Sequence, residues 1–458
     1  MKLKSIKFGG TSLSDVSSIF VCANIIKKAV NKYKSIVTVS AISGITDKML
    51  IIIKYARIFK IKMVSRSLTE LSKIHYNILF KIIENKRLFS KIWFNEFYPL
   101  LSELDTICKG VTLVGDLTDK TIAEICSFGE KLSSLLMFHA LNKLFVNCLI
   151  INSEFLIKTN SNFLKANIII SSTTHAIKKV ITPLVKNNIV PIITGFVGKD
   201  GNGNSTLLGR GASDYTASIV AMVMHAFSVE IWTDVDGIMS ADPKIVPNAL
   251  SWATVDINVM SEMSYSGAKV LHPDTVAMVV KKNIPVFVFN TFNSKFKGTK
   301  IIDKAYQSRG LVITYNNTLI TCKNIGILND TEFIYQMTKI VFEQKIPLNV
   351  YYTSEISLTF LVKKKDYSKK LLKCFERYGN IFVKNSITKI CLIGNNIKND
   401  NKLMADVFAI FKENQVFVQT ISVGYLGNNI TIMVKNNFDK KMIRELHNKL
   451  LETKKYYN

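Results

Sequence analysis

Residues 1–300 alternate between short apolar runs and longer amphipathic segments. The short runs are nearly continuous and rich in β-branched residues, which is typical of parallel strands buried on both faces. They are Leu3–Phe8, Ser35–Ser40, Ile189–Thr194, Val229–Thr233 and Ile284–Phe289. Apolar residues at spacings of three and four give the segment after the first run one apolar helical face. They are Val16, Ile19, Phe20, Ala23, Ile26 and Val30. The alternation predicts an α/β sandwich.

From about residue 305 the pattern changes to two successive units that each read strand, helix, strand, strand, helix. The first comprises Leu319–Cys322, Glu332–Phe342, Leu348–Tyr352, Ser357–Val362, Tyr367–Tyr378 and a closing strand at Ile381–Val383. The second comprises Lys389–Ile393, Leu403–Phe411, Phe417–Val423, Ile430–Val434 and Asp439–Leu451, without a visible closing strand. A repeat of roughly 70 residues predicts a tandem regulatory module. The polar stretch Asn293–Ser308 is the expected boundary.

Charge and composition narrow the possible partners. The net charge is +26, but the basic residues are spread along the chain, and Lys, Asn and Ile are over-used together. The base composition of an AT-rich genome explains this positive charge better than a nucleic-acid partner does, because nucleic-acid binding would need a basic stripe or block. No apolar stretch has membrane-spanning length and no secretory core follows Met1, so we expect a cytoplasmic protein without membrane association.

Cysteine and histidine spacing does not predict a resident metal site. The seven cysteines include no CxxC pair, and the six histidines form no HxxxH or HExxH pair. We expect the thiols to be reduced and mostly buried.

Polar, glycine-bearing loops follow several of the predicted strands. Lys7–Ser12 closes the first strand, Ser40–Thr46 the second, and Thr194–Phe196 another. Gly209–Thr216 and Thr233–Gly237 are two further loops of this kind. Ligands of open parallel sheets bind beyond the carboxyl ends of the strands. Adjacent glycines, a helix N-terminus and Lys7 suit phosphate oxygens, although the pattern is neither a Walker A loop nor a protein-kinase signature.

The ordered motifs resemble those of aspartate kinases in the amino acid kinase family. They are Lys7–Ser12 (KFGGTS), Ser40–Thr46, Phe128–Ser133 (FGEKLS), Gly209–Thr216 (GRGASDYT) and Trp232–Pro243. The resemblance covers nearly the whole chain. It implies an amino acid kinase-like αβα sandwich with a mainly parallel sheet over 1–298. Tandem ACT (βαββαβ) domains would follow at 309–385 and 386–458, with the strand near 310–314 able to pair with the second. Without an appended homoserine dehydrogenase domain, the chain resembles the monofunctional, lysine-sensitive type.

The resemblance also implies a set of site residues. Lys7 and Asp214 would be catalytic. The aspartate site would comprise Ser40, Thr46, Glu130, Arg210, Gly211, Ser213 and Asp214. The ATP site would comprise Lys7, Gly9, Gly10, Thr233, Asp234, Met239, Lys244 and Lys269. Read as bare sequence, Glu130 lies between an apolar and a polar helical face, where a solvated position is the default expectation.

The implied reaction transfers the γ-phosphoryl group of ATP to the side-chain carboxylate of L-aspartate, giving 4-phospho-L-aspartate, the first step of lysine, threonine and methionine biosynthesis. The cofactors would be ATP and Mg²⁺, with Mg²⁺ bound through ATP. A carboxylate nucleophile needs no general base, so positioning and positive charge should supply the catalysis, with Asp214 orienting Lys7. Three residues depart from the family pattern: Ala212 replaces a second glycine, Met239 an aromatic residue and Lys244 an arginine.

An L-lysine effector site is implied between the first repeats of two subunits, in a homodimer or homotetramer formed through the ACT domains. Its residues would be Ile327, Asp330, Asn349, Thr353, Ser354 and Glu355. Thr353, Ser354 and Glu355 keep the family pattern, whereas Asn349 replaces an aspartate that would face the effector's ammonium. We therefore expect weak or absent lysine feedback.

Three other functions stay open at this point. The chain could phosphorylate glutamate, N-acetylglutamate or uridylate, although Glu130, Arg210 and the repeats argue against these. An inactive amino-acid sensor would not need Lys7, Asp214 and Lys269. A nucleic-acid binder would show binding that weakens steeply with salt.

Overall fold

The computed structural model describes residues 1–209, 211–268, 271–304, 308–324, 331–348, 350–354, 356–424, 427–435 and 439–451. The chain forms two compact units. The first combines Met1–Ile238 with Leu271–Asp303, and the second combines Met239–Val270 with Lys304–Asn458. The segment Met239–Val270 falls within the range 1–298 predicted for the first domain, but it packs with the second unit.

The first unit is built on a mainly parallel sheet, as predicted. Its strands lie in the order β3-β4-β2-β1-β7-β9-β10, and β10 is antiparallel to β9. A β5–β6 hairpin forms a separate small sheet. The strands are β1 (Leu3–Phe8), β2 (Lys34–Val39), β3 (Cys148–Ile151), β4 (Val190–Thr194), β5 (Val197–Lys199), β6 (Ser205–Leu207), β7 (Ser228–Thr233), β9 (Val286–Asn290) and β10 (Thr299–Ile302). The five strands predicted from the apolar runs are all present, with ends shifted by at most two residues.

Helices cover both faces of this sheet. They are α1 (Val16–Val30), α2 (Ile45–Arg57), α3 (Ile61–Ile82), α4 (Lys86–Ile92), α5 (Tyr98–Val114), α6 (Asp119–Lys143), α7 (Ile170–Lys186), α8 (Ala212–Val223) and α10 (Pro273–Val280). Neighbouring strand residues enter different cores, because successive side chains point to opposite faces. Val37 packs into the core formed with α1, α2, α3, α5 and α6, whereas Ile36 packs into the core formed with α7 and α8. The predicted αβα sandwich is confirmed.

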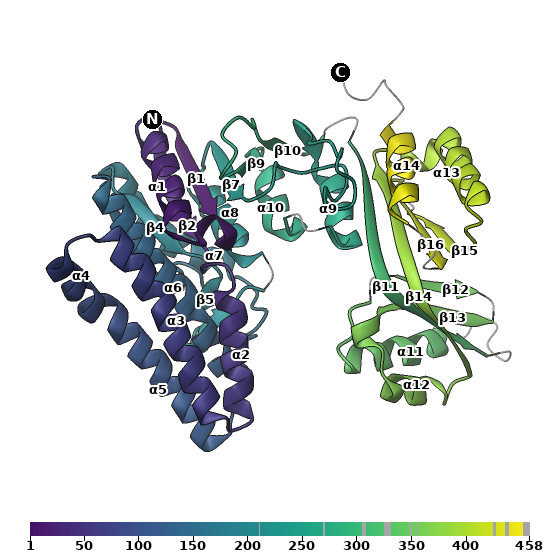
Figure 1. The fold of residues 1–458 in the computed structure, drawn as a ribbon, viewed down its shortest axis with the longest axis horizontal. Coiled ribbons are helices and arrows are strands. Elements are labelled where there is room, and N and C mark those ends of the chain that lie inside the picture. Colours follow the sequence, from purple (N-terminus) through teal and green to yellow (C-terminus); the bar gives the residue numbers. More distant parts are fainter. Residues whose placement is uncertain are drawn as a thin grey trace. The chain divides into compact units, whose positions relative to one another are not determined.

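The second unit contains a six-stranded antiparallel sheet in the order β12-β13-β11-β14-β16-β15. Its elements are β8 (Thr254–Asp256), α9 (Ile257–Ser266), β11 (Arg309–Lys323), α11 (Thr331–Glu343), β12 (Tyr351–Ser354), β13 (Ser357–Lys363), α12 (Lys369–Phe375), β14 (Asn380–Gly394), α13 (Asn401–Glu413), β15 (Val418–Val423), β16 (Asn429–Lys435) and α14 (Lys440–Leu451). The long strands β11 and β14 run through both repeats, with α11 and α12 on one repeat and α13 and α14 on the other (Figure 1). Among the described helices, none is long and apolar enough to cross a membrane.

The closing strand of the second repeat precedes the first repeat in the chain. Residues 309–314 of β11 pair with residues 389–394 of β14, whereas residues 317–323 pair with β13 and with residues 380–387 of β14. Each repeat is thus completed by half of a long strand. This explains why the sequence pattern showed a closing strand only for the first repeat.

Candidate active site

A glycine turn connects β1 to the first helix of the sheet. The Gly9 amide donates to the Trp232 carbonyl (3.0 Å), and the Gly10 carbonyl accepts from the Ser43 amide (3.0 Å). A Cβ atom on Gly10 would lie 2.7 Å from the Ala41 carbonyl oxygen, so only glycine allows the loops after β1 and β2 to approach this closely. The turn therefore offers an open backbone surface at the carboxyl ends of two parallel strands.

Lys7 and Asp214 form an ion pair at this end of the sheet. Lys7 is near the end of β1, and Asp214 is in the first turn of α8. The Lys7 Nζ–Asp214 Oδ1 distance is 2.6 Å, and both side chains are largely buried. Lys7 Nζ also lies 3.7 Å from the position that a Gly9 Cβ would occupy, so the ammonium faces the glycine turn. The prediction that Asp214 contacts Lys7 is consistent with this geometry.

Glu130 is a buried carboxyl group in the middle of α6. Its Oε1 accepts from the Ala41 amide (3.2 Å), whereas Oε2 has no hydrogen-bond partner among the described residues. Burial raises the pKa of Glu130 to about 8, because the charged form loses its hydration. The solvated position expected from bare sequence is wrong. Helix α6 packs against α1, α2, α3 and α5, so its polar side is enclosed as well as its apolar side.

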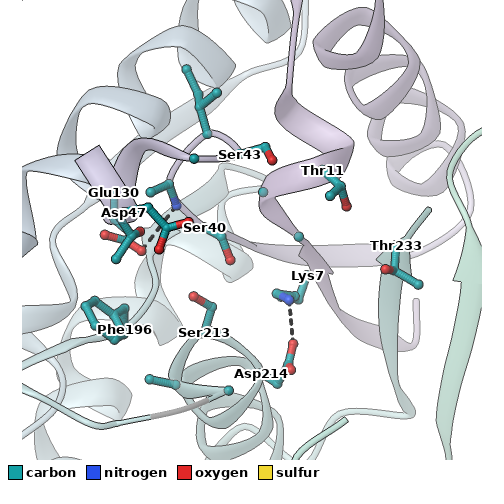
Figure 2. Close-up of a pocket in the computed structure, with 18 of the residues that line it drawn as sticks. Lys7, Thr11, Ser40, Ser43, Asp47, Glu130, Phe196, Ser213, Asp214 and Thr233 are labelled. Carbon is teal, nitrogen blue, oxygen red and sulfur yellow. Dashed lines mark hydrogen bonds and ion pairs between the residues drawn. The ribbon is translucent and has the colours of Figure 1, made fainter. Parts of the chain in front are cut away.

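One cavity of about 740 Å³ brings many of the predicted site residues together (Figure 2). From the predicted set, its walls include Lys7, Gly9, Gly10, Ser40, Thr46, Glu130, Gly211, Ser213, Asp214, Thr233 and Asp234. Met239 and Lys244 belong to the second unit. Arg210 and Lys269 lie outside the described residues. The cavity has a cationic side at Lys7 and the glycine turn, and a carboxyl group at Glu130.

The comparison with known proteins identifies the family. The model of the amino acid kinase family matches residues 2–290. The chain belongs to the amino acid kinase family. Among its relatives, lysine-sensitive aspartokinase 3 of Escherichia coli is 28% identical over 459 residues, covering 97% of this chain and 98% of that protein.

Two solved structures extend the likeness over both units. Aspartokinase III of E. coli in complex with lysine and aspartate has a TM-score of 0.83 and 26% identity, covering 98% of this chain and 99% of that one. The same enzyme in complex with aspartate and ADP has a TM-score of 0.82 and 25% identity, covering 98% and 100%. The amino acid kinase fold and the C-terminal repeats therefore both have counterparts in aspartokinases.

The departure from the family pattern at Ala212 causes no backbone strain. Positive φ values occur at Gly209 (87°) and Gly211 (67°), where glycine has no Cβ to clash. Ala212 is the first residue of α8, with Gly211 as its N-cap. The left-handed backbone conformation is therefore at Gly209 and Gly211, whereas Ala212 is helical.

The cavity wall also contains residues that were not in the predicted site set, among them Thr11, Ser43, Asp47 and Phe196. Thr11, Ser43 and Phe196 lie within the predicted strand-end loops Lys7–Ser12, Ser40–Thr46 and Thr194–Phe196, so these loops were the available signal. Asp47 directly follows Thr46 in the first turn of α2, where nothing in the sequence distinguishes it from a helix-terminal acid.

The predicted effector residues are only partly described. Thr353 and Ser354 are on β12, an edge strand of the six-stranded antiparallel sheet, and both are exposed. Ile327, Asp330, Asn349 and Glu355 lie outside the described residues. The expected loss of lysine feedback therefore stays a prediction.

Proposed function

We propose that this protein is an aspartate kinase, which transfers the γ-phosphoryl group of MgATP to the β-carboxylate of L-aspartate. The observation that carries the proposal is one cavity with a Lys7-bearing glycine turn and the buried Glu130 carboxyl group among its walls. The first suits phosphate, and the second suits the ammonium of an amino acid. The aspartate-bound structures of a relative with 25–26% identity support the same substrate.

The nucleotide is proposed to bind with its phosphates at Lys7, Gly9 and Gly10. Thr233 ends β7 and Asp234 follows it at the same sheet end. From family resemblance, Met239, Lys244 and Lys269 complete the nucleotide site. Mg²⁺ would arrive with ATP as part of the substrate and would offset the charge of its phosphates.

Aspartate is proposed to bind at the Glu130 side of the cavity. Glu130 pairs with its ammonium, and Arg210 grips a carboxylate through two parallel hydrogen bonds. Ser40, Thr46, Gly211 and Ser213 supply further polar contacts.

The reaction is an in-line displacement at the γ-phosphorus. The β-carboxylate oxygen attacks, the bond from the γ-phosphorus to the β,γ-bridging oxygen breaks, and ADP leaves with 4-phospho-L-aspartate as product. The nucleophile is already ionised at neutral pH, so the barrier lies in bringing two anions together. Lys7 and the glycine turn lower that barrier by stabilising charge on the transferring phosphoryl oxygens. Asp214 holds the Lys7 ammonium in place.

A cytoplasmic location, a homodimer or homotetramer through the ACT repeats, and residual L-lysine binding remain proposals from sequence. The first two are tested by localisation of the tagged chain and by the mass of the purified protein in solution.

The deciding experiment is ATP turnover with L-aspartate, with hydroxylamine present to trap the acyl phosphate as aspartyl hydroxamate. Glutamate, N-acetylglutamate and uridine monophosphate serve as competing acceptors in parallel reactions. Hydroxamate formed only with aspartate supports the proposal. Turnover that prefers another acceptor contradicts the proposal. So does the absence of hydroxamate when ATP is shown to occupy the active site.

A further inference from the structure

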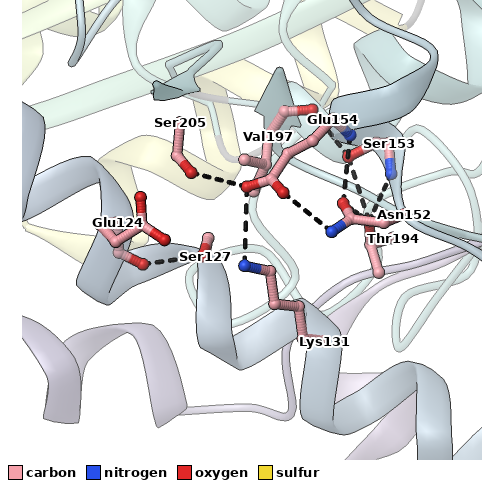
Figure 3. Close-up of polar contacts among 9 residues, drawn as sticks. All are labelled: Glu124, Ser127, Lys131, Asn152, Ser153, Glu154, Thr194, Val197 and Ser205. Atoms are coloured by element: carbon pink, nitrogen blue, oxygen red, sulfur yellow. Dashed lines mark hydrogen bonds and ion pairs between the residues drawn. The ribbon is translucent and has the colours of Figure 1, made fainter. Parts of the chain in front are cut away.

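A buried carboxylate lies at the centre of a polar network beside the cavity. Glu154, in the short 3₁₀ turn Ser153–Phe155, is only 7% exposed. Its Oε1 accepts from Ser205 Oγ (2.7 Å) and lies 3.6 Å from Lys131 Nζ, and its Oε2 accepts from Asn152 Nδ2 (2.9 Å). These contacts are drawn in Figure 3. Glu154 thus joins α6, β6 and the segment after β3.

Two of these partners, Lys131 and Ser205, are connected along the chain to residues that line the cavity. Lys131 follows Glu130 in α6, on a turn that is also fixed by the hydrogen bond from Ser133 Oγ to the Ser40 carbonyl (2.7 Å). Ser205 begins β6, and the chain runs from there to Gly209 and the N-cap of α8. Displacing Glu154 would therefore affect the part of the cavity wall at Glu130 and the part at Gly209 at once.

The same network supports a strained residue in the cavity wall. Phe196 has φ of 74°, and the Val197 amide donates to the Gly195 carbonyl (2.9 Å), which together describe a γ-turn of the rare, strained kind. Ser153 Oγ donates to the Val197 carbonyl (2.7 Å), and the Ser153 amide donates to Thr194 Oγ1 (2.8 Å). Such a conformation persists only where surrounding contacts fix it, and Ser153 fixes both sides of the turn.

We propose that Glu154 and Lys131 are positioning residues for the aspartate end of the site. The inference rests on the proposed function, because it assigns them to the substrate that Glu130 would bind. The Lys131–Glu154 pair holds the Glu130 turn of α6 against the segments that carry Phe196 and Gly209. Both side chains of this ion pair are largely buried, with side-chain exposures of 17% for Lys131 and 9% for Glu154, so water cannot easily solvate either charge.

The test compares Glu154→Gln with a matched control in a second ion pair whose lysine is also on α6. Glu154→Gln removes the charge while keeping the size of the side chain. Glu84→Gln makes the same change in the Lys143–Glu84 ion pair (2.7 Å). Lys143 is the last residue of α6, and Glu84 is exposed to solvent. Lys131→Met and the Lys131→Met/Glu154→Gln double variant complete a cycle. Each purified variant is assayed for aspartate KM, ATP KM, kcat and thermal midpoint.

We expect Glu154→Gln and Lys131→Met each to raise the aspartate KM by about tenfold, because small displacements of binding groups are costly even when the change is remote from the chemistry. The ATP KM should stay within about twofold, and Glu84→Gln should change neither constant. The double variant should lose less than the sum of the single variants, because neither charge is left unpaired.

A folded Glu154→Gln enzyme with unchanged aspartate KM would overturn the inference, as would equal increases for aspartate and ATP. A lower thermal midpoint with unchanged aspartate KM would show a purely structural role and is also a refutation. If Lys131→Met does not fold, the isosteric Glu154→Gln variant decides alone. Wild-type turnover tests the proposed function separately, because it needs no variant.

Discussion

The pKa of Glu130 predicts how aspartate use depends on pH. In the free protein burial raises this pKa to about 8, so the carboxyl group is mostly protonated at neutral pH. Only the ionised form attracts the substrate ammonium. Aspartate binding therefore competes with the proton, and the apparent KM should fall as pH rises through the pKa of Glu130.

The size of this effect follows from the fraction of Glu130 that is ionised. With a pKa of about 8, the apparent aspartate KM exceeds its limiting value about 11-fold at pH 7, about 2-fold at pH 8 and about 1.3-fold at pH 8.5. We therefore expect kcat/KM for aspartate to rise roughly eightfold between pH 7 and pH 8.5. The ammonium of free aspartate stays protonated over this range, so it does not offset the gain.

The assay measures aspartate saturation at saturating MgATP across this pH range, with ADP detection coupled to an enzyme whose own pH dependence is corrected. ATP saturation at fixed aspartate is the internal control, and its KM should vary little. Glu130→Gln should abolish the pH dependence and hold aspartate KM high throughout. A wild-type aspartate KM that is flat, or that rises with pH, refutes the assignment of Glu130 to the ammonium.

Three further predictions concern the charges of the site and the regulatory unit. Lys7→Ala should lower kcat by a factor of about 10² to 10³ with a smaller effect on aspartate KM, and near-normal turnover in single-turnover measurements would contradict the proposed role. Arg210→Ala should raise aspartate KM about 10- to 150-fold while ATP KM stays normal, and unchanged aspartate saturation would locate the carboxylate site elsewhere. L-Lysine at sub-millimolar concentration should not half-inhibit the enzyme. The Asn349→Asp variant should lower the half-inhibitory lysine concentration by about 10- to 150-fold. Half-inhibition of the wild type by sub-millimolar lysine would show that the effector pocket is intact.

The elements that the sequence predicted well are those whose signal is local. Helix α1 begins and ends where the apolar stripe does, at Val16 and Val30, and the Asp15 side chain caps it by accepting from the Ser18 amide (2.8 Å). Strand β1 also matches its apolar run, Leu3–Phe8. In both cases residues near one another in the chain determine the structure, so periodicity and capping are sufficient.

The features that sequence could not predict depend on distant residues. The burial of Glu130 comes from helices that pack around α6, and the partner of Glu154 is 23 residues away on α6. The inclusion of Met239–Val270 in the second unit depends on contacts such as those from the Leu311 amide to the Ser240 carbonyl (2.7 Å) and from Asn429 Nδ2 to Glu262 Oε2 (3.0 Å). Hydrophobic periodicity carries no information about such contacts. The strand-end loops could be predicted as a ligand site from their pattern, whereas the roles of individual residues came only from the resemblance to a known family.

The Lys7–Asp214 pair is better explained by catalysis than by stability. A buried ion pair often contributes little net stability, because removing two charges from water costs about as much as their attraction returns. The ammonium nevertheless has three N–H donors, and its contact with Asp214 Oδ1, the one found among the described residues, leaves other donors able to reach phosphate oxygens at the adjacent glycine turn. In the proposed mechanism, Asp214 fixes the direction of the Lys7 ammonium before ATP binds and leaves N–H donors available for the phosphates. A cation that is already oriented needs little reorganisation as negative charge shifts onto the leaving oxygen, and this is the condition under which electrostatic stabilisation of a transition state is most effective.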